Sequence, residues 1–147
     1  MSRNLILEKF DLFSIILVSI LTISGLINSA HPNQKILGFP ALKGDFLSDN
    51  ISKFVSRNNW ELITDFHFGG YAKVDPELID FINNFKTAQE IPLDPVYTGK
   101  LLFGVYKLIE NGYFKKGSKI LAIHTGGLQG IAGMNDRLKQ KGLALIE

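Results

Sequence analysis

The hydrophobic residues of this chain follow two patterns, a continuous run near the start and a helical spacing further on. The run from Leu12 to Ile27, LFSIILVSILTISGLI, contains no charged residue. Apolar residues at 101, 102, 105, 106, 108 and 109 instead fit one broad face of a helix. We therefore expect a partly buried helix over 101–109.

The continuous run is compatible with three structures, because nearly every position in it is apolar and periodicity cannot separate them. A membrane helix needs about 20 apolar residues, so this run is at the short limit. A signal peptide would use Arg3, the run and a small-residue exit at 28–30, but the charges at 8, 9 and 11 stand before the apolar core. The third structure is a buried strand followed by a core helix of an α/β fold.

The rest of the pattern predicts an α/β fold. Short strands are expected over 35–40 and 60–64, with a loop at 41–49 and a short amphipathic helix over 51–57 between them. Asp75 can cap a further helix, with Pro76 at its first position and Glu77 complementing its dipole. The run 119–123 predicts a parallel strand buried on both faces, and His-Thr-Gly-Gly follows at its carboxyl end, where such sheets bind ligands. Residues 128–134 are expected to form a loop or short helix, and the last residues a solvated tail.

The stretch Ile91–Lys100, IPLDPVYTGK, leads into the helix predicted over 101–109. Its two prolines favour an extended approach, because the residue before each is pushed away from the helical region. Tyr97, Thr98 and Gly99 then occupy the helix start. Exposed amides there would suit an anionic or hydrogen-bond-accepting ligand. The alternative is that Thr98 simply caps the helix.

Composition narrows the class of protein. The chain has 147 residues, enough for one domain with a core, and 46% of them are hydrophobic. The net charge is +2 and the lysines are scattered, so nucleic acid is not expected as a partner. The chain has no cysteine, which excludes disulfides and thiolate metal sites, and its three histidines lack metal-ligand spacing with one another.

Four ordered blocks point to a family. They are ILGFPALKGDF (36–46), FGGYA (68–72), DPVYTGK (94–100) and IHTGG (123–127). Together they resemble the C-terminal part of the 1-aminocyclopropane-1-carboxylate deaminase / D-cysteine desulfhydrase family over roughly 22–138. The resemblance implies an α/β fold, part of a doubly wound, mostly parallel sheet of the tryptophan synthase β type (fold type II), incomplete in this chain. It also implies pyridoxal 5'-phosphate as cofactor, a small amino-acid substrate, and a homodimer for the intact family.

The resemblance assigns roles to five residues. Tyr97 and Tyr71 match the family's active-site tyrosines, which we take as the catalytic residues. Thr98 stands where deaminases proper carry a glutamate near the pyridine nitrogen. A neutral hydroxyl there resembles the desulfhydrase side of the family and favours β-elimination, giving pyruvate and ammonia. Thr125 resembles the other hydroxyl near that nitrogen, and Gly126 would let the backbone approach the ring.

Two parts of the family's site are not found. No lysine here has the Asn-Lys-x-Arg-Lys-like context of the lysine that binds the cofactor, so Lys100 is expected to be solvated or structural. Residues 17–21, LVSIL, stand where the glycine-rich phosphate loop is expected and contain no glycine. We therefore interpret 1–21 as a poorly matching apolar segment and 22–147 as the C-terminal portion of a catalytic domain. The hypothesis is a truncated or frameshifted product, inactive alone, whose neighbouring DNA encodes the lysine-bearing half.

Each of these residues also has a purely structural interpretation. The tyrosines would ordinarily be core aromatics, and His124 a strand-end histidine with a satisfied hydrogen bond. The family implies a cytoplasmic enzyme. The alternative is a non-catalytic remnant that Leu12–Ile27 anchors in a membrane or directs to secretion.

Overall fold

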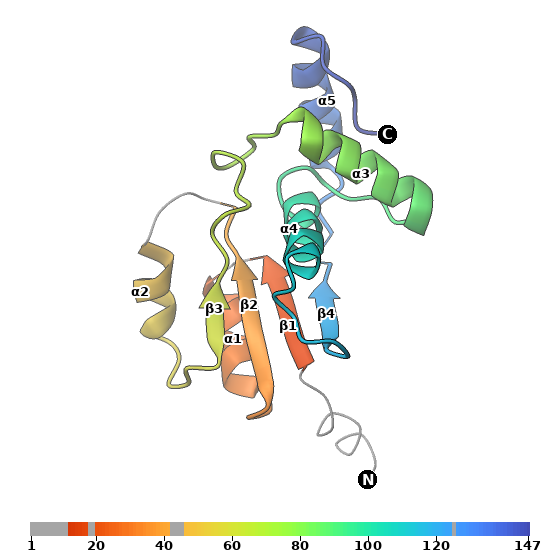
Figure 1. The fold of residues 1–147 in the computed structure, drawn as a ribbon. Helices are drawn as coiled ribbons and strands as arrows, with labels where there is room; N and C mark the ends of the chain where they lie inside the picture. Colours follow the sequence, from red (N-terminus) through yellow and green to blue (C-terminus); the bar gives the residue numbers. More distant parts are fainter. Residues whose placement is uncertain (1–11, 18–19, 42–45, 125) are drawn as a thin grey trace.

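The computed structural model describes residues 12–17, 20–41, 46–124 and 126–147, with only the backbone for 12–17. Strands and helices alternate along most of the chain (Figure 1). Their bounds are β1 Leu12–Leu17, α1 Ile20–Ser29, β2 Gln34–Phe39, α2 Phe46–Ser52, β3 Trp60–Leu62, α3 Pro76–Gln89, α4 Thr98–Glu110, β4 Lys119–Ile123 and α5 Gly130–Gln140. The α/β class predicted from the pattern is confirmed.

The four strands form one parallel sheet in the order β3-β2-β1-β4. The first strand lies inside the sheet: Leu12 is in register with Gln34 of β2 on one side and with Lys119 of β4 on the other. Parallel strands need crossover connections, and here α1 and α4 lie in two of them. The carboxyl ends of all four strands therefore meet at one edge of the sheet.

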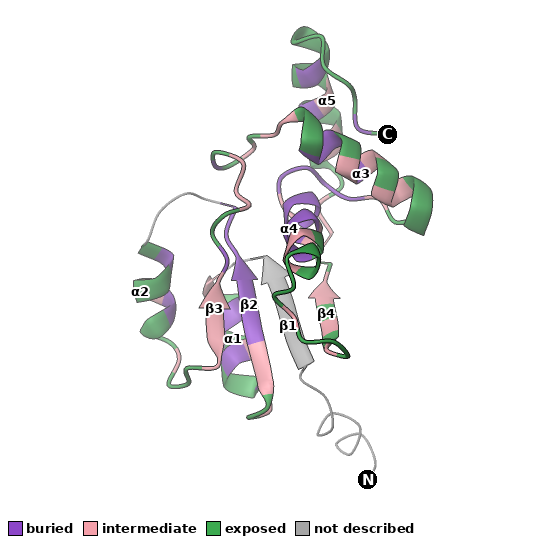
Figure 2. Cartoon of the chain, in the orientation of Figure 1, coloured by how far each residue is buried: buried purple, intermediate pink, exposed green. Residues whose placement is uncertain are grey.

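Alternating side chains of β2 divide the helices between the two faces of the sheet. Ile36 packs with Ile23 and Ile27 of α1, whereas Leu37 packs with Leu101 and Val105 of α4. Buried residues accordingly gather along β2 and α4, while the outer surface of α2 is exposed (Figure 2). Adjacent residues of one strand thus face two different helical layers.

A second core lies beyond the carboxyl edge of the sheet, where Figure 1 shows α3 and α5 near the start of α4. Its buried members come from these three helices and the segments around them: Leu78, Ile79, Ile82, Leu93, Val96, Phe103, Met134, Leu138 and Ile146. Phe66, Phe68 and Ala72 of the loop after β3 pack against this cluster.

Several local predictions are confirmed. Leu12–Ile27 contains β1 and most of α1, as the strand-and-helix interpretation expects. Within the described ranges, no helix has both the length and the apolar character needed to cross a membrane. Asp75 caps α3, since its Oδ1 accepts a hydrogen bond from Leu78 N at 2.9 Å, and Pro76 is the first helical residue.

Four predictions need correction. The short helix is α2, Phe46–Ser52, rather than 51–57, and it therefore begins inside the predicted loop of 41–49. Leu47 and Ile51 are buried one turn apart, whereas Phe54 is exposed. β4 is an edge strand with Leu121 exposed, not a strand buried on both faces.

The third correction concerns α4, whose buried face includes Phe103 and Gly104, whereas Tyr106 and Ile109 are exposed. The fourth is the end of the chain, which is not simply solvated. Ile146 is buried, and its N–H and C=O both bond the side chain of Asn135.

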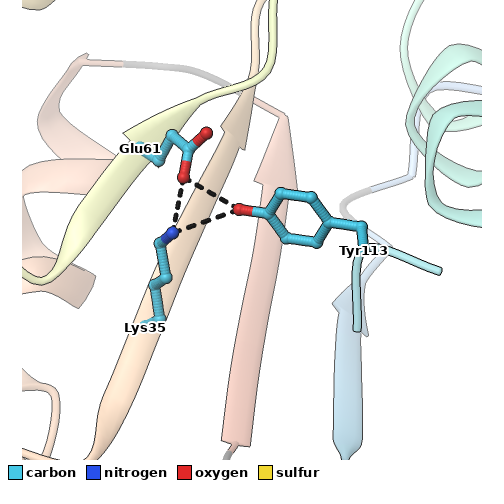
Figure 3. Close-up of polar contacts among 3 residues, drawn as sticks. All are labelled: Lys35, Glu61 and Tyr113. Carbon is cyan, nitrogen blue, oxygen red and sulfur yellow. Dashed lines mark hydrogen bonds and ion pairs between the residues drawn. The ribbon is translucent and has the colours of Figure 1, made fainter. Parts of the chain in front are cut away.

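Lys35, Glu61 and Tyr113 form a polar cluster, here called the clasp, that joins the turn after α4 to β2 and β3 (Figure 3). The Lys35 ammonium on β2 contacts Glu61 on β3, and it donates to Tyr113 Oη at 3.1 Å. Tyr113 Oη in turn donates to Glu61 Oε2 at 2.8 Å. The hydrogen bond from Lys35 holds the pKa of Glu61 below its usual range. The clasp lies at the amino ends of the strands, away from the residues singled out for function.

Candidate functional site

One buried carboxylate organises the start of α4. Asp94, 1% exposed, accepts the N–H groups of Val96 and Tyr97 on Oδ1 at 2.9 and 2.7 Å, and that of Thr98 on Oδ2 at 2.8 Å. Its own carbonyl accepts the N–H of Gly99 at 2.8 Å. Four backbone donors at the helix start are therefore satisfied internally, and the expectation of an anion site at these amides is wrong.

Thr98 shares this arrangement. Its hydroxyl is 1% exposed, donates to Asp94 Oδ2 at 2.7 Å and accepts from Asp94 N at 3.0 Å. The hydroxyl bonds the preceding turn and leaves the capping of backbone amides to Asp94, so the simple cap interpretation is also wrong. Because the hydroxyl proton is committed to Asp94, Thr98 can offer a neighbouring group only a lone pair.

The two tyrosines that the resemblance singles out lie together. Their ring centroids are 6.1 Å apart in an edge-to-face arrangement, and Tyr97 Oη donates to Tyr71 Oη at 3.4 Å. This hydrogen bond, with burial, raises the pKa of Tyr97 to about 12. Tyr97 therefore keeps its proton at neutral pH, and Tyr71 is 56% exposed.

The segment that follows β4 lies next to Asp94 and Tyr97. Gly127 has φ +103°, and a Cβ added to it would lie 3.5 Å from Asp94 Oδ2 and 3.8 Å from Tyr97 Cδ2. Gly126 has φ +89°, with open space where its Cβ would be, and its N–H donates to His124 Nδ1 at 3.1 Å. His124 Nε2 lies 3.3 Å from the carbonyl of Pro92. Thr125 lies outside the described residues, as do residues 18–19 of the expected phosphate-loop segment.

Lys100 is structural and not solvated, which is one of the two alternatives expected from the sequence. It is 2% exposed, and its ammonium donates to the carbonyls of His67 and Gly70, each at 2.8 Å. Burial lowers the pKa of Lys100 to about 8, against the opposing charges of Asp94 and Asp75. Its place in YTGK gave no signal for this role, because its partners are backbone carbonyls some thirty residues away.

A pocket of about 300 Å³ opens beside Tyr71. Its lining combines apolar residues of α5 with the basic side chains of Lys73, Arg137 and Lys141. Across the described ranges, no group of three histidine, aspartate or glutamate side chains lies close enough to hold a metal ion. The site therefore consists of a tyrosine pair at the carboxyl edge, with a buried carboxylate behind it.

Comparison with known proteins supports the resemblance. No protein-family model matches the chain. It is 43% identical over 74 residues to a protein of Pyrococcus horikoshii provisionally named 1-aminocyclopropane-1-carboxylate deaminase, covering 50% of this chain and 22% of that protein. A similarly named protein of Pyrococcus furiosus is 35% identical over 99 residues, covering 65% of this chain and 30% of that protein.

More distant relatives and a solved structure agree. The 1-aminocyclopropane-1-carboxylate deaminase of Bradyrhizobium diazoefficiens is 31% identical over 83 residues, which are 56% of this chain and 25% of that protein. The crystal structure of a homologue of this deaminase matches with a TM-score of 0.74 and 27% identity, over 90% of this chain and 44% of that chain. The match thus spans less than a third of these curated relatives and lies in their C-terminal part.

Proposed function

We propose that this chain, whose sequence and fold match the C-terminal part of the 1-aminocyclopropane-1-carboxylate deaminase family, supplies the tyrosine-bearing wall of a pyridoxal-phosphate site. The observation that carries the proposal is the contact between Tyr71 and Tyr97 at the carboxyl edge of a parallel sheet. Ligands of such sheets bind at this edge. The reaction class is deamination of a small amino acid.

Tyr71 and Tyr97 suit the ring of the cofactor, but Lys100 does not suit its carbonyl group. An aromatic pair with an exposed phenol suits a pyridine ring and an amino-acid substrate. Lys100 does not suit the cofactor's carbonyl, because its amine is buried and bonded to two backbone carbonyls. We propose that the lysine and the phosphate-binding groups come from a segment outside these 147 residues, and that the chain alone is inactive.

The tyrosines would act through their protons. When bound, pyridoxal phosphate supplies an electron sink for charge left on the substrate's α-carbon. Tyr97 donates to Tyr71, which leaves the proton of Tyr71 free to bond a substrate oxygen or a leaving group. Hydrogen bonds in such a chain strengthen one another, so Tyr97 makes Tyr71 a better donor. Asp94 and Thr98 hold Tyr97 by fixing the helix start on which it lies.

The substrate class follows from Thr98. In this proposal a neutral hydroxyl near the ring nitrogen supports β-elimination of a thiol, as from D-cysteine, better than opening of a cyclopropane ring. Thr98 carries no charge of its own, unlike the glutamate that stands at this position in deaminases proper according to the resemblance.

Ammonia release tests the proposal. The chain would be assayed alone with pyridoxal phosphate and, separately, joined to the part of the Pyrococcus horikoshii protein that precedes the matched region. We expect activity only from the joined protein, faster with D-cysteine than with 1-aminocyclopropane-1-carboxylate. Tyr71→Phe should lower kcat by about 10²-fold or more, the usual contribution of a positioned proton donor. Tyr97→Phe should lower it less.

Tyr106→Phe is the matched control, since Tyr106 lies on α4 among Phe81 and Phe85, and it should leave the rate unchanged. An active joined enzyme that tolerates both Tyr71→Phe and Tyr97→Phe would disprove the assignment of the pair. Ammonia release by the chain alone would disprove the need for a further segment.

A further inference from the structure

The ammonium of Lys100 is bound by a part of the chain distant from it in sequence. Lys100 lies in the first turn of α4, but its Nζ reaches the loop after β3 and bonds two of its carbonyls, those of His67 and Gly70. It also lies 5.9 Å from the ring centroid of Phe68, over the ring face. Carbonyls that converge on a buried ammonium form a specific site, because a desolvated charge is costly unless it is hydrogen-bonded.

The loop that Lys100 binds has a strained backbone. Phe68 and Ala72 have φ of +54° and +53°, and Gly69 and Gly70 between them are also in the positive range. A non-glycine residue in this region costs about 1–2 kcal/mol. Such a loop keeps one conformation only when surrounding contacts hold it there. Within the loop, Gly70 N–H donates to the His67 carbonyl at 3.0 Å and Lys73 N–H donates to the Gly70 carbonyl at 3.2 Å. The two bonds from Lys100 add a tie from these same carbonyls to α4, beside the packing of Phe66, Phe68 and Ala72 on the core.

Tyr71 directly follows Gly70, whose carbonyl Lys100 holds, and Tyr97 lies three residues before Lys100. The same turn of α4 therefore fixes both partners of the tyrosine contact. We propose that Lys100 is a positioning residue that holds the loop of residues 66–72 so that the Tyr71 hydroxyl stays on Tyr97. Its effect on turnover rests on the proposed function, whereas its effect on the tyrosine contact does not.

The orientation of Tyr71 is the direct test. Lys100→Met keeps the length and apolar stem of the side chain and removes the charge and all donors. In this variant we expect the nuclear Overhauser effects between the Tyr71 and Tyr97 rings to disappear. Those between Phe81 and Tyr106, whose centroids are 5.5 Å apart, should persist. Amide exchange across residues 67–72 should become about tenfold faster or more, without a comparable change in α5.

Lys107→Met is the matched control. Lys107 lies on the same helix over the ring of Phe103, and its ion-pair partners, Glu77 at 3.2 Å and Glu110 at 3.7 Å, lie outside the loop. It should keep the Tyr71–Tyr97 ring contacts and the exchange rates of 67–72. A Lys100→Met protein that is folded and retains these contacts and rates would overturn the proposal.

A measurement on the unaltered chain covers the case in which Lys100→Met fails to fold. The Lys100 side chain can be followed by its ¹³Cε resonance during a pH titration. A midpoint near 8 is expected because the amine is buried, together with nuclear Overhauser effects from the Lys100 Hε protons to the Phe68 ring, over which Nζ lies at 5.9 Å. A solvated lysine would show neither, and the absence of these Overhauser effects would overturn the proposal. Neither readout uses cofactor or substrate, so both can succeed even if the proposed enzymatic function is wrong.

Discussion

At the scale of single residues, Asp94 has the largest number of local partners in the candidate site. Its carboxylate accepts three backbone N–H groups and the Thr98 hydroxyl while almost wholly buried. Removing it would leave these donors without an acceptor in the interior, where an unpaired polar group is costly.

Asp94→Ala should therefore lower the free energy of unfolding by about 2–4 kcal/mol, more than an ordinary helix cap contributes. Urea denaturation followed by circular dichroism measures this. Asp80→Ala, an exposed position on α3, should change stability by less than about 0.5 kcal/mol. Equal effects of the two substitutions would contradict the role assigned to Asp94.

The sequence reveals some of these residues and hides others. Tyr71 and Tyr97 stand out through short motifs, and their contact follows once the loop and the helix start meet. A structural role for Lys100 is one of the two alternatives expected from the sequence, but its partners could not be identified there, because they are backbone carbonyls that no residue type signals. Asp94 is visible as a turn former, yet the number of amides it accepts depends on the three-dimensional turn rather than on spacing.

At the scale of secondary-structure elements, the approach of α4 to the sheet depends on a glycine. A Cβ at Gly104 would lie 2.5 Å from Phe39 Cε1 on β2 and 2.8 Å from Phe66 Cδ2. Phe39 and Phe66 also stack on one another at 6.3 Å. Two ring edges therefore occupy the space where a methyl group would be added, and neither can move without disturbing the other.

Gly104→Ala should destabilise the protein by about 1–3 kcal/mol through overpacking, although alanine is the better helix former. Gly133→Ala is the matched control, because no atom lies within 4 Å of the added Cβ in α5. It should stabilise by about 0.5–1 kcal/mol. Thermal unfolding of both variants gives the comparison, and a shift of the same sign in both would refute the packing argument.

The elements themselves were predictable where their signals are local. Asp75, Pro76 and Glu77 define the start of α3 from chemistry within one turn. The position of α2 was not predictable from the sequence. Its bounds follow the burial of Leu47 and Ile51, which depends on the tertiary structure, and no local capping residue indicates where it begins. The exposure of β4 was also hidden, since an apolar run does not tell whether its strand has one neighbour or two.

At the scale of the whole molecule, the buried amine of Lys100 makes stability depend on pH. Its pKa is about 8 in the folded chain and 10.5 ordinarily, so between these values the unfolded chain binds more protons. The free energy of unfolding should then rise with pH across this window. Below about pH 8 both states are protonated and above about 10.5 both are neutral, so the contribution of Lys100 is flat outside it.

The rise should amount to at most about 3 kcal/mol, and it should be absent in Lys100→Met. Comparing the two proteins by urea unfolding at intervals from pH 7 to 10.5 isolates it, because the other titrating groups contribute to both. Lys139→Met, at an exposed position of α5, should keep the profile of the unaltered chain. Parallel profiles for the unaltered chain and Lys100→Met would show that Lys100 carries an ordinary charge.

The strand order has a consequence for how the chain reaches its fold. β1 is made before β2, β3 and β4, but one of its two neighbours in the sheet is β4, so Leu12 can pair with Lys119 only after all the residues between them have been made. Closing so long a segment has an entropic cost that non-local contacts offset only once they form. β1, β2 and β3 can pair in the order in which they are made, but one edge of β1 stays open until β4 is added. We expect the sheet to be completed late, with that edge of β1 open to chaperones until β4 has been made.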